Sequence, residues 1–174
     1  MGGLDVTLVL CIIHRQTVRY SMKEEQVDVV HAGDEIVAHA TRKECHKHGL
    51  RHRIVHVIIT QGDKVYVQRR STKKDIYPGY YEASLSGHVR RGESYEQAAK
   101  RELKEELGVK QGRLKKLGTF VYETRKEHAM CAVFLLQDYQ GEITLDKEEV
   151  ASGTWRKTLP QKLTPGTKYC AFLL

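Results

Sequence analysis

The sequence predicts an α/β domain in which helices cover a mixed β-sheet. Strand patterns dominate the chain, and most of them occur in pairs joined by short turns, which predicts hairpins. One long amphipathic helix is predicted at residues 94–107. A sheet with an apolar face has to bury that face, and helices packed on the sheet are its natural cover.

The chain is long enough for one domain with a buried core. Its 174 residues are 40% hydrophobic and 29% charged, which is ordinary globular usage. No repeat or low-complexity linker divides it, so we expect a single domain over residues 22–174. Residues 1–21 precede Met22 and are expected to be an N-terminal extension or a misassigned start. The alternative is an additional strand packed on the domain.

Charge and cysteine content restrict the class of partner and the compartment. Lysine and arginine total 29 against 22 acidic residues, a surplus that favours anionic partners. The cysteines, at 11, 45, 131 and 170, form no CxxC pair, which favours reduced thiols and a cytoplasmic location. The apolar run at residues 4–13 contains Asp5, lacks a preceding basic region and is too short to span a bilayer. We therefore expect neither a signal peptide nor a membrane anchor.

The first half of the chain predicts two hairpins separated by a short helix. The predicted strands are residues 26–31, 35–40, 53–60 and 64–70. The turns between paired strands are Ala32-Gly33-Asp34 and Gln61-Gly62-Asp63, and the second pair is rich in β-branched residues typical of central strands. The helix is predicted at residues 41–48 and ends at Gly49.

The second half contains the strongest helix signal. The sequence Tyr77-Pro78-Gly79 breaks the chain before it. Ser94 and Gln97 have the spacing of a capping box, and Gly108 is the predicted stop. The apolar stripe of this helix is Ala99, Leu103 and Leu107. Strands are predicted at residues 113–124, 129–139 and 152–157, and the apolar tail at 169–174 is expected to pack on the domain.

Carboxylates are concentrated on one face of this helix. Glu105 and Glu106 lie three and four residues beyond Glu102, so all three project from the same face. Like charges at these spacings destabilise a helix by about 0.2–0.5 kcal/mol per pair. A cation that prefers hard oxygen ligands, Mg²⁺ or alternatively Mn²⁺, would compensate for this repulsion.

The alternative for the same helix is a solvated surface stabilised by ion pairs. That interpretation requires pairs between Glu96 and Lys100 and between Arg101 and Glu105, as on most charged helices.

The helix also belongs to a longer spacing pattern. The fixed positions are Gly87, Glu93, Arg101-Glu102-Leu103, Glu105-Glu106 and Gly108-Val109. At all of them the segment resembles the signature of the Nudix hydrolases. The resemblance implies a Nudix fold, a mixed sheet sandwiched between α-helices, and hydrolysis of a diphosphate linked to another moiety. It also implies a divalent metal ion held by the acids of this segment.

Roles for individual residues follow from the resemblance. Glu102, Glu105 and Glu106 would bind Mg²⁺, and one of them would act as the base for the attacking water. Glu93 and Arg101 would form the pair that orients the helix, and Gly87 would let the backbone approach the metal. The sequence does not indicate which of these three glutamates acts as the base.

A looser resemblance extends over residues 27–155, to the subgroup related to isopentenyl-diphosphate isomerase. It rests on the segments GLRHRIVHV, RRSTKKDIYPG and SGH, and on EEV separated by four residues from Trp155. Arg70 and Lys74 fall where diphosphate-binding cations of that isomerase lie, and Arg69 adjoins them. The alternative for this basic segment is a solubilising loop. His88, which matches a metal-binding histidine of the isomerase, completes the expected substrate site, and His52 is a candidate match for a second such histidine in an incomplete set.

Two departures from the isomerase favour hydrolysis over isomerisation. Ser86 stands where the isomerase has a cysteine, and a hydroxyl is a far weaker acid and nucleophile. The two glutamates of the isomerase are represented here by Glu127 and Ala129. The expected substrate is a small diphosphate metabolite. A noncatalytic RNA-binding module is the other alternative, but the basic strands lack interleaved aromatic residues.

Histidines crowd one stretch of the chain without a compact ligand motif. They occur together with one cysteine, as His39, Cys45, His46, His48, His52 and His56. His46 and His48 would point to different faces of a helix. We therefore expect ordinary surface and core histidines here rather than a transition-metal site.

Overall fold

The computed structural model describes residues 24–171, so the expected extension at residues 1–21 lies outside the described residues. The strands are β1 (Gln26–Val30), β2 (Ile36–Thr41), β3 (His52–Gln61), β4 (Lys64–Arg70), β5 (Tyr81–Ala83), β6 (Leu85–His88), β7 (Leu114–Glu123), β8 (His128–Leu136) and β9 (Val150–Arg156). The helices are α2 (Arg42–His48), α3 (Tyr95–Leu107) and α4 (Pro165–Cys170). None of the described helices is long and apolar enough to cross a membrane.

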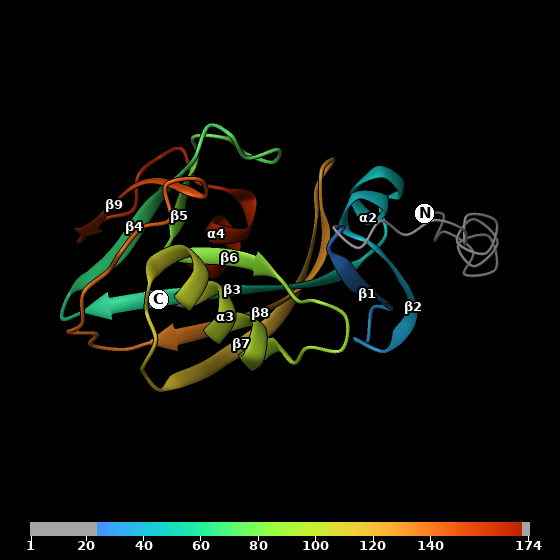
Figure 1. The fold of residues 1–174 in the computed structure, drawn as a ribbon, viewed down its shortest axis with the longest axis horizontal. Helices are drawn as coiled ribbons and strands as arrows, with labels where there is room; N and C mark the ends of the chain where they lie inside the picture. The colour runs from blue at the N-terminus through green and yellow to red at the C-terminus, as the bar shows by residue number, and fades with distance from the viewer. Residues whose placement is uncertain (1–23, 172–174) are drawn as a thin grey trace.

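The sheet is mixed and is organised around β3 (Figure 1). β3 runs parallel to β8 and antiparallel to β6, while β7 and β8 form the predicted hairpin. At its far end β3 pairs with β4 only around the turn, and β4 then diverges to pair with β5 and β9. This divergence leaves space between the two parts of the sheet.

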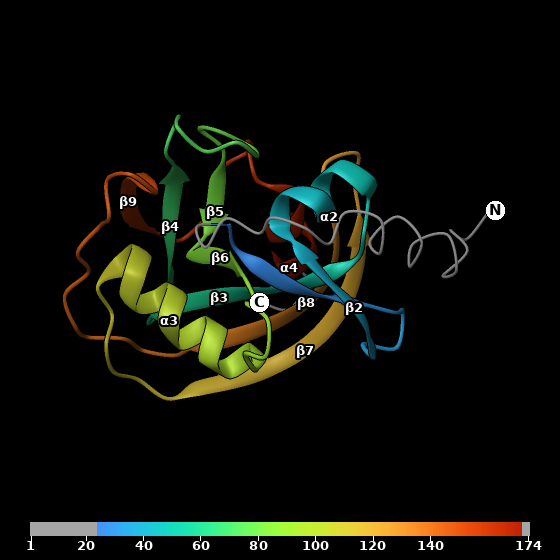
Figure 2. The same ribbon diagram turned by 45° about the vertical axis from the view of Figure 1, so that its right-hand side comes forward.

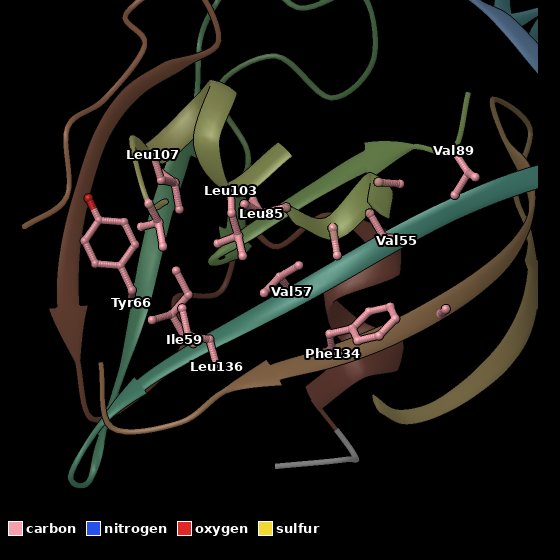
Figure 3. Packing of buried hydrophobic residues seen from close by; sticks show 14 of the residues in the cluster. Val55, Val57, Ile59, Tyr66, Leu85, Val89, Leu103, Leu107, Phe134 and Leu136 are labelled. Atoms are coloured by element: carbon pink, nitrogen blue, oxygen red, sulfur yellow. The ribbon is translucent and has the colours of Figure 1, made fainter. Parts of the chain in front are cut away.

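Helices cover both faces of the central strands (Figure 2). Successive residues of β3 point to opposite faces, and both faces are apolar, as expected for a strand buried on two sides. The core on the α3 side includes Val55, Val57, Ile59, Leu103 and Leu107 (Figure 3). The core on the α4 side includes Ile54, Ile58, Cys131, Val133 and Cys170. The predicted mixed sheet between helices is confirmed.

The ends of α3 are formed as predicted. Ser94 accepts a hydrogen bond from the backbone of Gln97, and the Gln97 side chain accepts one from the backbone of Ser94. Gly108 adopts the left-handed conformation with φ of 66°, which suits a residue without a side chain. The shorter helix α2 is likewise capped by Thr41 at its start and by Gly49 at its end.

Two strands and one helix are absent from the sequence-based prediction. β5 and β6 are separated by Ser84, whose φ is 64°. The Ser84 hydroxyl accepts from the backbone of Ile59 and donates to the carbonyl of Tyr66, so distant strands stabilise this bend. Such short strands carry little periodicity of their own.

The third missed element, α4, begins before the expected apolar tail at residues 169–174 and overlaps it only at Tyr169 and Cys170. Cys170 is buried and Tyr169 stacks on Phe120, although residues 172–174 lie outside the described part.

Candidate functional site

A cavity of about 740 Å³ opens beside α3, between the two parts of the sheet. Its walls include these predicted site residues: Arg70, Lys74, Gly87, His88, Glu102, Glu105 and Glu106. Arg69, Glu93 and Arg101 do not line it. A cavity of this size suits a small ligand.

The carboxylates of α3 enter this cavity at different depths. Glu102 and Glu106 are buried, with 8% and 4% of their surface exposed, whereas the Glu105 side chain is half exposed. Burial raises the pKa of Glu102 to about 7 and that of Glu106 to about 8. Charged carboxylates are therefore poorly stabilised here by the protein alone. A cation with a preference for oxygen ligands fits this set of donors.

Gly87 leaves the space that Glu102 occupies. A Cβ atom at this position of β6 would lie 2.2 Å from Cδ of Glu102. Only glycine allows this carboxylate to pack against the strand and remain at the cavity wall.

Arg101 connects the loop before α3 with the helix. Its guanidinium donates two hydrogen bonds of 2.9 Å to Glu93 and one of 2.8 Å to the carbonyl of His88. It also donates to Glu102 and, at 3.1 Å, to Glu105. Bidentate pairing fixes both position and orientation. Arg101 therefore holds the carboxylates in place from behind the cavity wall.

The ion pairs of a solvated helix are also present. Glu96 and Lys100 lie 2.6 Å apart, and both side chains are more than half exposed. The outer face of α3 is therefore solvated surface, while the face that carries Glu102 and Glu106 borders the cavity.

The basic residues near the cavity already contact carboxylates. Arg70 is buried and donates to Glu82 at 3.0 Å, and Lys74 forms an ion pair with Glu149. The side chain of Arg69 points to the other face of β4 and donates to a backbone carbonyl at 3.4 Å. The expected role of Arg69 in substrate binding does not fit this placement.

Three histidines and one glutamate form a cluster that sequence spacing did not predict. His46 of α2, His52 of β3, His88 of β6 and Glu127 place one potential ligand atom each within 4.8 Å of the others. Oε1 of Glu127 lies 3.4 Å from Nε2 of His88 and 3.7 Å from Nε2 of His52. Four separate elements bring His46 and His52 into this group, which could hold a metal ion, whereas the sequence indicated ordinary surface and core histidines.

The same arrangement changes the interpretation of His88. Its ring belongs to this cluster, 3.3 Å from His46 between Nε2 atoms, and it also lies at the wall of the cavity. Burial lowers the pKa of both His46 and His88 to about 4, so both rings are neutral near pH 7. Neutral imidazole is the form that binds metal ions.

His52 is oriented toward the centre of the cluster. Its Nδ1 lies 3.0 Å from the carbonyl oxygen of Leu50 and donates to it, which leaves Nε2 as the free lone pair. Nε2 is buried and has no hydrogen-bond partner among the residues that the structure describes. Within those same residues, Glu102, Glu105 and Glu106 do not converge this closely as a set of three.

Comparison with known proteins identifies the family. The sequence matches the NUDIX domain over residues 50–159. It is 32% identical over 141 residues to an uncharacterised Nudix hydrolase of Yersinia pestis, covering 80% of this chain and 76% of that protein. An uncharacterised Nudix hydrolase of Streptomyces coelicolor is 34% identical, with coverage of 81% and 77%. The chain belongs to the Nudix hydrolase family. This Nudix hydrolase acts on diphosphate bonds, and enzymes of the family generally use divalent metal ions.

Solved structures support the same fold. The crystal structure of DR0079 from Deinococcus radiodurans matches this Nudix hydrolase with a TM-score of 0.65 and 26% identity, covering 85% of this chain and 88% of that one. The MutT NUDIX hydrolase from Burkholderia pseudomallei matches with a TM-score of 0.64 and 23% identity, over 71% and 98% of the two chains.

Proposed function

We propose that this Nudix hydrolase cleaves the diphosphate linkage of a small metabolite, of the nucleoside diphosphate or another diphosphate type, with Mg²⁺ as cofactor. The observation that carries the proposal is a single cavity that combines the carboxylates of α3 with Arg70 and Lys74. Its volume of about 740 Å³ suits a metabolite rather than a polymer.

The residues of the cavity wall have complementary roles in this proposal. Glu102, Glu105 and Glu106 would hold the Mg²⁺, and Gly87 leaves room for Glu102. When bound, the ion supplies charge neutralisation of the diphosphate and a lower pKa for a bound water. One of these carboxylates accepts the proton of the attacking water. Lys74 has its ammonium at the cavity wall and would orient phosphate oxygens.

Isomerisation of isopentenyl diphosphate is the less favoured alternative. The cluster of His46, His52, His88 and Glu127 agrees with the resemblance to that isomerase, and it would suit a second cation such as Zn²⁺. However, Ser86 occupies the cysteine position and donates to Glu82 at 2.8 Å. Ala129 is fully buried and offers no carboxylate. Both departures remove groups that isomerisation would need.

An RNA-binding module without catalysis is also disfavoured. The buried acids of α3 would repel phosphate unless a cation compensates for them.

The decisive test of the proposed function is turnover with identified products. The wild type and Glu105→Gln would be assayed with and without Mg²⁺ on nucleoside diphosphate derivatives, dinucleotides and isopentenyl diphosphate, with products measured by mass. We expect Mg²⁺-dependent hydrolysis, reduced by roughly 10²–10⁴-fold in the variant. Glu96→Gln, on the solvated face of α3, is the matched control and should keep wild-type turnover.

Three outcomes would contradict the proposal. Equal turnover in Glu105→Gln and wild type would remove this helix from the chemistry. Conversion of isopentenyl diphosphate into an isomer of the same mass, separated from the substrate by chromatography, would support the isomerase. Retained RNA binding in EDTA without any turnover would support the binding module.

A further inference from the structure

A second group of potential metal ligands lies on the α4 side of the sheet. His56 comes from β3, Cys131 from β8 and Cys170 from α4. One ligand atom of each lies within 4.8 Å of the other two. β3 and β8 are parallel neighbours, and α4 packs across them from the far end of the chain.

All three side chains are buried between the apolar core on the α4 side and the wall of the cavity. Their exposed fractions are 2% for His56, 0% for Cys131 and 1% for Cys170, and Ile54 and Ile58 belong to the same part of the core. Neither ring nitrogen of His56 has a hydrogen-bond partner within residues 24–171. A buried imidazole without any partner is costly, so this ring points to a missing ligand.

We propose that His56, Cys131 and Cys170 bind a zinc ion. Zinc bonds are about 2.3 Å to sulfur and about 2.0–2.1 Å to nitrogen, so ligand atoms on one ion lie less than about 4.6 Å apart, close to the spacing seen here. Two thiolates and a neutral imidazole are donors that select zinc over magnesium. Two thiolates also neutralise Zn²⁺, which suits a site removed from water.

The zinc ion anchors α4 to the sheet. α4 has only six residues, so tertiary contacts have to stabilise it. Gly166 of α4 packs directly on His56, because a Cβ there would lie 2.2 Å from Nε2. His56 and Gly166 both line the cavity described above. The site therefore supports one wall of the cavity, and it does not depend on which reaction the cavity performs.

The experiment uses the full chain with Cys11→Ser and Cys45→Ser, which leaves only the two thiols of the proposed site. Cobalt(II), a spectroscopic substitute for zinc, absorbs strongly in the near ultraviolet when thiolates bind it. The acids of α3 and the histidine cluster bind through oxygen and nitrogen, so they produce no such band. Zinc content per chain is measured in parallel after dialysis against Mg²⁺.

We expect a thiolate–cobalt band that zinc abolishes by displacement, and loss of the band when Cys170→Ser is added. His56→Asn should shift the cobalt titration to higher concentrations. If Cys170→Ser fails to fold, the parent chain still decides the matter, because only Cys131 and Cys170 can produce its band. The proposal is overturned if the folded parent shows no band, or if mass analysis finds Cys131 and Cys170 joined as a disulfide.

Discussion

At the scale of single residues, close approaches decide how the carboxylates face the cavity. Gly87 admits Glu102, and Gln68 donates to Glu106 at 3.0 Å and to Glu82 at 3.2 Å. These contacts are buried, so each has a fixed geometry with little water to replace a lost partner. A change that displaces a carboxylate should therefore lower activity, and a change that breaks a buried ion pair should lower stability.

Gly87→Ala should displace Glu102, because the new Cβ would lie 2.2 Å from its Cδ. We expect kcat/KM for the substrate found in the panel to fall by roughly 10²-fold, as misplaced catalytic groups do. Gly118→Ala is the matched control, since a Cβ there meets no atom within 4 Å. Comparable activity in the two variants would show that the close contact between Gly87 and Glu102 is unimportant for activity.

Arg70→Leu should leave Glu82 as an unpaired buried charge. Arg70 and Glu82 are 8% and 2% exposed as side chains. Breaking such a pair from one side lowers the free energy of unfolding by ~3–5 kcal/mol. Urea denaturation would measure this loss, and Arg70→Leu/Glu82→Leu should recover most of it. A double variant no more stable than the single one would argue against an isolated charge as the cause. Lys73→Ala, in an exposed pair, should change little.

At the scale of elements, α3 is the part of the site that local sequence specifies most completely. Its beginning and end are capped, and its buried residues follow helical spacing. The helix then presents Leu103 and Leu107 to the core, and Glu102 and Glu106 to the cavity. The rotation of the helix about its axis therefore determines both which side chains pack in the core and which carboxylates face the cavity.

Ser94→Ala removes the N-cap of α3, which should lower the free energy of unfolding by about 1 kcal/mol. Ser94 is exposed, so no cavity contributes to the loss. Thermal or urea denaturation would check this value against Ser152→Ala, an exposed position on β9 that caps nothing. Equal stability of the two variants would mean that tertiary packing alone positions α3.

At the scale of the whole molecule, the histidine cluster joins four regions of the chain. α2, β3, β6 and the turn that carries Glu127 each contribute one side chain. A bound cation would therefore link α2 and the turn before β8 to the paired strands β3 and β6.

Zinc at about 100 times its dissociation constant should raise the free energy of unfolding by about 2.7 kcal/mol, and EDTA should reverse this. The part of this gain that comes from the cluster should be lost in His46→Gln and kept in His48→Gln, and thermal melts of both variants would measure it. Both residues lie on α2, but only His46 belongs to the cluster. If both variants respond to zinc like the wild type, the cluster does not bind it.

The hairpins and α3 could be predicted because their signals are local. Turn residues, β-branched runs and caps act over a few positions, and the structure contains these elements close to their expected bounds. β5, β6 and α4 were missed because they are short and depend on distant partners, such as the contacts of Ser84 with Ile59 and Tyr66.

The family signature can be recognised without a structure, because Gly87 to Val109 is one continuous segment whose acids share a helix face. Which other residues meet depends on how the chain folds in three dimensions. The fold brings His46 to Glu127, and Cys131 to Cys170, across elements far apart in the chain, and it turns Arg69 away from the cavity. The physical reason is that periodicity and capping act between neighbours, whereas ligand clusters form through space when strands pair and helices pack.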